Sequence, residues 1–139
     1  MGYNQDISIT VDAVVFRKND KDLELLLIQR KNEPFKNKWA LPGGFLEVDE
    51  ELETGAKREL KEETGLYIQR LTQLRAFGKL GRDPRGRTIS VALYGYAEGD
   101  TNVKASDDAK DAQWFPVSEL PELAFDHVKI IEDVLKALK

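Results

Sequence analysis

Residues 44–66 restrict the fold of this chain more than any other stretch, because they join a helical pattern to clustered carboxylates. Glu59, Glu62 and Glu63 are spaced i, i+3 and i+4, so on a helix all three carboxylates lie on one face. Like charges at these spacings repel by about 0.2–0.5 kcal/mol per pair on an exposed helix. The cluster therefore indicates a counter-charge from outside the helix, and carboxylate oxygens suit hard divalent cations such as Mg²⁺.

The rest of this stretch carries the other signals of an amphipathic helix. An apolar stripe with a spacing of four occupies the opposite face: Leu52, Ala56 and Leu60. Asp49 suits the N-cap position, and Gly65 suits the left-handed position that follows a helix. Gly55 costs about 1 kcal/mol relative to Ala inside a helix, so we expect another group to pack closely against it.

The whole stretch reads Gly-x5-Glu-x7-Arg-Glu-apolar-x-Glu-Glu-x-Gly-apolar, and this pattern resembles the signature of the Nudix hydrolase family. The signature positions are Gly44, Glu50, Arg58, Glu59, Leu60, Glu62, Glu63, Gly65 and Leu66. The alternative interpretation is a solvated acidic helix, which is the usual meaning of a charge run. Matches at every specified offset favour the family.

The resemblance implies a metal-dependent hydrolase. Glu59, Glu62, Glu63 and the main-chain carbonyl of Gly44 would bind Mg²⁺, with Mn²⁺ as an alternative. Glu62 and Glu63 are also candidate catalytic residues, Glu62 as a ligand or as the group that activates water. Cleavage of a pyrophosphate requires charge neutralisation, a positioned water and a stabilised leaving group, and metal ions supply all three.

Arg58 and Asp108 complete the candidate catalytic residues. Arg58 cannot bind a metal cation, so we expect it to pair with Glu50 or, at i+4, with Glu62 and to support the helix face. The resemblance places a further carboxylate in a loop before the penultimate strand. Asp108, six residues before Trp114, has the matching offset. It is a candidate metal ligand or general base, and the alternative is a solvated loop charge.

Three arginines and one aromatic residue outside the signature are candidates for substrate binding. Arg82 and Arg85 precede a predicted strand, where their guanidinium groups suit phosphate or ribose hydroxyls, or simply form a charged hairpin loop. Together with Arg30 and Phe125, they lie in segments that resemble the small ADP-ribose pyrophosphatases among Nudix enzymes. That resemblance covers most of residues 10–133, and it implies hydrolysis of ADP-ribose to AMP and ribose 5-phosphate. Phe125 either stacks on adenine or belongs to the core.

Two other functions stay open. One is a Nudix hydrolase of another nucleoside diphosphate or triphosphate derivative. The other is a non-catalytic domain that senses ADP-ribose, like those joined to DNA-binding domains in repressors of nicotinamide metabolism. Because the chain ends at Lys139 and its signature is intact, we expect an enzyme. The single histidine, His127, lies beside Asp126 at a predicted helix start, where we expect it to cap or pack.

The pattern of apolar residues predicts strands and helices in alternation. Strands are expected at residues 7–17, 23–30, 66–77, 88–98 and 112–115, and a second helix at about 127–138. This pattern predicts an α/β domain, and the length of 139 residues favours one domain spanning residues 1–139. The resemblance further implies an α/β/α sandwich with a mixed sheet and a loop-helix-loop metal site.

Composition restricts the compartment and the partners. A net charge of −4 without a basic tract argues against nucleic acid as a partner. The absence of cysteine excludes disulfides and favours the cytoplasm. No apolar run approaches the roughly 20 residues that span a membrane. We expect a small-molecule nucleoside diphosphate as the substrate, and the resemblance adds a homodimer.

Overall fold

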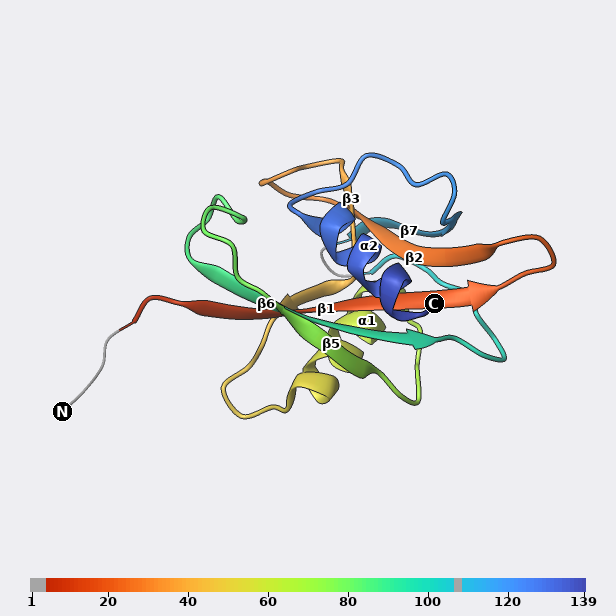
Figure 1. Ribbon diagram of the computed structural model, residues 1–139, viewed down its shortest axis with the longest axis horizontal. Helices are drawn as coiled ribbons and strands as arrows, with labels where there is room; N and C mark the ends of the chain where they lie inside the picture. Colours follow the sequence, from red (N-terminus) through yellow and green to blue (C-terminus); the bar gives the residue numbers. More distant parts are fainter. Residues whose placement is uncertain (1–4, 107–108) are drawn as a thin grey trace.

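The computed structural model describes residues 5–106 and 109–139, which form a mixed β-sheet with helices on both sides (Figure 1). The elements in chain order are β1 (Ser8–Lys18), β2 (Leu23–Arg30), β3 (Trp39–Ala40), β4 (Gly43–Phe45), α1 (Leu52–Thr64), β5 (Thr72–Phe77), β6 (Thr88–Tyr96), β7 (Ala109–Pro116) and α2 (His127–Ala137). The predicted strands at 7–17 and 23–30 and the predicted C-terminal helix are confirmed with small shifts at their ends.

The central strand of the sheet is β1, which pairs in parallel with β6 and antiparallel with β2 and β4. β1 and β2 pair only where residues 16–18 face residues 23–25. Beyond that point β1 pairs with β4, whereas β2 pairs with β3 and β7. The two long strands therefore separate toward one end of the sheet.

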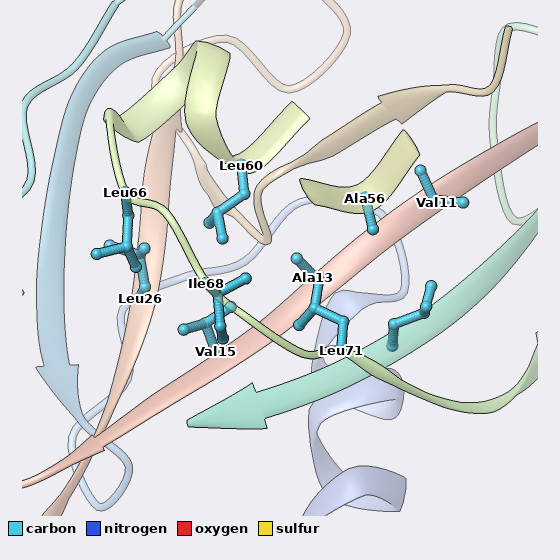
Figure 2. Close-up of a cluster of buried hydrophobic side chains, with 10 residues drawn as sticks. Val11, Ala13, Val15, Leu26, Ala56, Leu60, Leu66, Ile68 and Leu71 are labelled. Atoms are coloured by element: carbon cyan, nitrogen blue, oxygen red, sulfur yellow. The ribbon is translucent and has the colours of Figure 1, made fainter. Parts of the chain in front are cut away.

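The side chains of β1 alternate between two hydrophobic clusters, as the period of two in a strand requires. One cluster packs against α1 and contains Val11, Ala13, Val15, Leu26, Ala56 and Leu60 (Figure 2). The other packs against α2 and contains Val14, Phe16, Leu25, Leu27, Ile130, Ile131 and Val134. Because the sheet is covered on both faces, the expected α/β/α arrangement is confirmed.

The helix α1 begins later than the sequence indicates. Its N-cap residue is Glu51, which makes no side-chain cap bond, so the prediction of Asp49 as the N-cap is wrong. The chain before the helix turns instead through Glu50, whose carboxylate accepts the Glu47 N–H. The other end is as predicted, because Gly65 adopts φ 74° and donates its N–H to Lys61. The expected close packing at Gly55 is also present, since an added Cβ would lie 2.7 Å from Leu46 Cδ1.

The predicted strand at residues 66–77 is a strand only from Thr72 to Phe77. Residues 66–71 run outside the sheet and bury three apolar side chains in the α1 cluster: Leu66, Ile68 and Leu71. Two side chains of α1 bind the main chain of this segment, because Glu53 accepts the Leu71 N–H and Lys57 donates to the Gln69 carbonyl. This segment therefore finds hydrogen-bond partners without joining the sheet. Within the described ranges, no helix is long and apolar enough to cross a bilayer.

The close approach of this segment to β6 generates a test at Gly95. A Cβ at Gly95 would lie 2.6 Å from the Arg70 carbonyl oxygen, whereas a Cβ at Gly78 would meet its nearest neighbour at 3.6 Å. We therefore expect Gly95→Ala to lower the free energy of unfolding by about 1–3 kcal/mol, as overpacking does. The matched Gly78→Ala variant should change it by no more than about 1 kcal/mol. Urea unfolding of both variants measures the difference, and equal stabilities would contradict the packing described here.

Candidate active site

A cavity of about 470 Å³ opens where β1 and β2 separate. Its walls come from these strands, from the turn between β3 and β4, from α1, from the hairpin loop at residues 79–87 and from the start of α2. Charged or ring-bearing side chains of its lining include Asp12, Arg30, Glu59, Glu63, Phe125 and His127. Acidic and basic groups therefore share one cavity.

The glycines of β4 bring the main chain against the carboxylates of α1. The Gly43 N–H donates to Glu63 Oε1 at 2.8 Å, and Glu63 is buried. An added Cβ at Gly44 would lie 2.6 Å from Glu59 Oε2, so a side chain at this position would displace that carboxylate. The structure thus brings Gly44, Glu59 and Glu63 together, and their role as metal ligands stays a prediction.

Arg58 joins three of the acidic residues around it. Its guanidinium donates to Glu50 through Nε at 2.9 Å and Nη2 at 2.7 Å, and to Glu59 through Nη1 at 2.8 Å. Nη1 also lies 3.3 Å from Glu62. Both pairings expected for Arg58 are therefore present. The hydrogen bond from Arg58 lowers the pKa of Glu50 from 4.5 to about 2.

The acidic face presents carboxylate oxygens that differ in burial and in charge stabilisation. Burial raises the pKa of Glu59 above its ordinary value, although the bond from Arg58 opposes this effect. Its charged form thus lacks stabilisation that a cation would supply. Glu62 is more exposed, at 44% of its side chain. No three Asp, Glu, His or Cys side chains within residues 5–106 and 109–139 are arranged around one point. The carboxylates of Glu59 and Glu63 are the kind of oxygen donor that Mg²⁺ binds while it keeps several waters, and the Gly44 carbonyl stays a predicted ligand.

Arg82 is one of the predicted substrate-binding residues, and its guanidinium pairs with Asp126. Two hydrogen bonds of 2.7 and 2.9 Å join the two side chains, and the Arg82 side chain is 4% exposed. This pair fastens the hairpin loop at residues 79–87 to the residue before α2. A substrate-binding role for Arg82 stays a prediction, with this ion pair already in place.

The ring of Phe125 is in contact with the other two predicted arginines. The guanidinium carbons of Arg30 and Arg85 are 5.0 and 5.3 Å from the centre of its ring, within the range of a cation–π contact. Arg85 also lies 4.9 Å from the ring of Phe45, which is 46% exposed. All four residues line the cavity. The structure therefore brings these predicted residues together, whereas Asp108 lies outside the described residues.

Asp12 lines the cavity and was missed by the sequence analysis. It lies in the middle of β1, is 5% exposed, and accepts a hydrogen bond from the buried Ser90 hydroxyl. A carboxylate within an otherwise apolar strand was the available signal. His127 packs as expected, because it is buried and its Nδ1 accepts the Leu41 N–H at 3.0 Å. It also faces the cavity, which the sequence did not indicate.

Comparison with known proteins identifies relatives of the whole chain. The family model of the NUDIX domain matches residues 7–137. The "ADP-ribose pyrophosphatase" of Methanocaldococcus jannaschii is 45% identical over 93% of this chain and 73% of its own length. The "ADPR responsive transcriptional repressor NtrR" of Acinetobacter baylyi is 34% identical over 94% of this chain, which spans 54% of that repressor. The solved NUDIX domain of Shewanella oneidensis NrtR, complexed with ADP ribose, superposes with a TM-score of 0.91 at 34% identity, covering 98% of this chain and 91% of that one.

The Arg58–Glu50 pair makes stability depend on pH. Because the folded pKa of Glu50 lies below its ordinary value of 4.5, the pair stabilises the fold above pH 4.5 and loses its effect as pH falls toward 2. We therefore expect Glu50→Gln to lower the free energy of unfolding most at neutral pH, with the deficit shrinking between pH 4.5 and 2. Urea unfolding at several pH values measures this change. The matched Glu51→Gln variant, at an exposed residue, should stay within about 0.5 kcal/mol of the original protein at every pH. A deficit that does not vary with pH would contradict the assignment.

Proposed function

Because the chain belongs to the NUDIX domain family and is a Nudix pyrophosphohydrolase, we propose that it hydrolyses ADP-ribose to AMP and ribose 5-phosphate. The observation that carries this proposal is the cavity itself, which has carboxylates on α1 and two guanidinium groups beside the ring of Phe125. A nucleoside diphosphate sugar is an anion that carries a planar base. Guanidinium groups suit its phosphates, an aromatic ring suits its base, and carboxylates can hold the metal ion that its hydrolysis requires. The M. jannaschii relative supports the reaction, and the S. oneidensis complex supports the ligand.

The acidic half of the cavity requires a cation before a pyrophosphate can enter it. We assign Glu59, Glu63 and the Gly44 carbonyl as the groups that hold Mg²⁺ or Mn²⁺, with Glu62 at the exposed edge as a ligand or as the group that activates water. A bound divalent ion neutralises phosphate charge and lowers the pKa of a bound water. The chain holds these oxygens in place, because Gly43 binds Glu63 and Arg58 binds Glu59.

The basic half of the cavity then binds the rest of the substrate. Arg30 and Arg85 contribute positive charge for the two phosphates, and Phe125 offers a ring face for adenine. Arg58 holds the catalytic carboxylates in position, since its donors bind Glu50 and Glu59. Asp108 stays in the proposed catalytic set as a metal ligand or general base.

The cellular setting is also part of the proposal. We expect the enzyme to act in the cytoplasm as a homodimer on a free nucleotide, without nucleic acid as a partner. The absence of cysteine supports the cytoplasm, the net charge of −4 argues against nucleic acid, and the homodimer rests on the family resemblance alone.

Product analysis tests the substrate. With Mg²⁺ and a panel of nucleoside diphosphate and triphosphate derivatives, we expect AMP to appear fastest from ADP-ribose and to be lost with a chelator. Faster release of pyrophosphate from a triphosphate would contradict ADP-ribose as the substrate, but it would not contradict the proposed metal site. Binding of ADP-ribose without turnover would overturn hydrolysis in favour of sensing, the role that the name of the A. baylyi repressor describes.

Metal-dependent stabilisation tests the acidic half separately from turnover. At a Mg²⁺ concentration 100 times its dissociation constant, binding to the folded state stabilises it by about 2.7 kcal/mol. We expect Glu63→Gln and Glu59→Gln to abolish this gain and to lower kcat/KM by at least about 100-fold. The exposed Glu51→Gln variant should keep both properties. Thermal unfolding with and without Mg²⁺ measures the stabilisation. If Glu63→Gln is stabilised by Mg²⁺ as much as the original protein, Glu63 is not a metal ligand.

A further inference from the structure

Asp12 and His127 form part of the cavity lining that neither the proposed metal site nor the proposed hydrolysis uses. Asp12 comes from the middle of β1, and His127 is the first residue of α2. Each residue is 5% exposed, and each lines the cavity. Burial of two such polar side chains is costly unless their hydrogen-bonding atoms find partners. The partners of these atoms therefore indicate what each side chain can bind.

The hydrogen bond at one ring nitrogen of His127 determines which nitrogen carries the proton. The Leu41 N–H donates to Nδ1 at 3.0 Å, so Nδ1 is the unprotonated nitrogen. Burial also lowers the pKa of His127, which favours the neutral ring. The neutral ring then carries its hydrogen on Nε2, so His127 offers one hydrogen-bond donor on the side of Asp12.

Asp12 offers an acceptor beside that donor. Its Oδ2 is bound by the Ser90 hydroxyl, while its Oδ1 lies 3.7 Å from His127 Nε2, which is too long for a hydrogen bond. Among the described residues, no side-chain nitrogen or oxygen is sealed from solvent without a partner. Both atoms therefore reach the space of the cavity. Gly43 keeps the oxygen uncovered, since an added Cβ there would lie 2.6 Å from Oδ1.

We propose that Asp12 and His127 bind one hydroxyl group of the substrate sugar, which donates to Asp12 Oδ1 and accepts from the Nε2–H of His127. An oxygen about 2.8 Å from each atom spans the observed gap. A hydroxyl is donor and acceptor at the same atom, as this pair requires. A phosphate oxygen only accepts and is repelled by the carboxylate, and an ammonium group cannot accept from the imidazole.

This pair makes the cavity select for a sugar hydroxyl rather than for charge alone. That the hydroxyl belongs to one of the two riboses of ADP-ribose rests on the proposed function. A substrate that lacks this hydroxyl leaves a buried acceptor and a buried donor without partners. That loss corresponds to about 10- to 100-fold in kcat/KM.

The test compares ADP-ribose with five analogues, each of which lacks a different one of the five ribose hydroxyls. For the original protein, we expect one analogue to lose about 10- to 100-fold in kcat/KM, mainly through KM, and the others to lose less. In Asp12→Asn and His127→Gln, turnover of ADP-ribose should fall toward that of the sensitive analogue, so the preference for the hydroxyl disappears. Thr10→Val, on the same face of β1 and also buried in the cavity lining, is the matched control and should keep the preference.

The ratio between substrates separates recognition from a structural role. If the original protein treats all five analogues like ADP-ribose, the proposal is overturned while hydrolysis of ADP-ribose stands. If Asp12→Asn lowers kcat/KM by the same factor for ADP-ribose and for every analogue, the proposal is also overturned. In that case the pair would not contact a substrate hydroxyl, and a water molecule would bridge the two side chains instead. Loss of Mg²⁺-dependent stabilisation in Asp12→Asn would assign Asp12 to the metal site instead.

Calorimetric measurement of the affinity for the same analogues tests the hydroxyl site without turnover and without variants. If the protein hydrolyses none of these compounds, the proposed function fails, but weaker binding of one deoxy analogue still supports the hydroxyl site. Equal binding of all analogues overturns the hydroxyl site by itself.

Discussion

The guanidinium of Arg58 holds together an arrangement of charges that would otherwise oppose folding. Glu59, Glu62 and Glu63 lie on one face of α1, and Glu59 is partly buried. Arg58 donates to Glu59 and Glu62 from one side and to Glu50 from the other, so it fixes both the helix and the chain that precedes it. Because like charges repel and burial raises the pKa of Glu59, Arg58 stabilises this face from inside the protein, and the proposed cation in the cavity would stabilise it further.

The sheet determines where this acidic face can act. β1 and β2 pair over a short length and then separate, and each continues with a different short strand. The strand β4 carries Gly43 and Gly44 into the opening, where their main chain meets Glu63 and Glu59. A side chain at either glycine would collide with its surroundings. Gly43 and Gly44 are thus explained by close approach rather than by an unusual backbone angle.

Local features of this fold were predictable from the sequence, and contacts between distant residues were not. The end of α1 at Gly65 and the pairing of Arg58 with Glu50 follow from spacing along one segment. The strand predicted at residues 66–77 is partly wrong, because Glu53 and Lys57 bind the main chain before Thr72. No periodicity reveals such side-chain contacts. The bond between His127 and Leu41 likewise joins residues 86 positions apart, so the cavity-facing role of His127 appears only in three dimensions.

This division between local and distant contacts also separates the two halves of the cavity. The acidic half comes from one helix and the turn before it, so its signature is contiguous and easily recognised. The other half is assembled from β1, the hairpin loop at residues 79–87 and the start of α2, which the Arg82–Asp126 pair holds together. Substitutions in these separate segments change the groups that a substrate meets without altering the signature. A pyrophosphatase and a repressor can therefore both resemble this chain along most of its length. In the proposed enzyme, the groups for metal-dependent cleavage therefore come mainly from α1, whereas the proposed substrate-binding groups Arg85, Phe125, Asp12 and His127 come from the other segments.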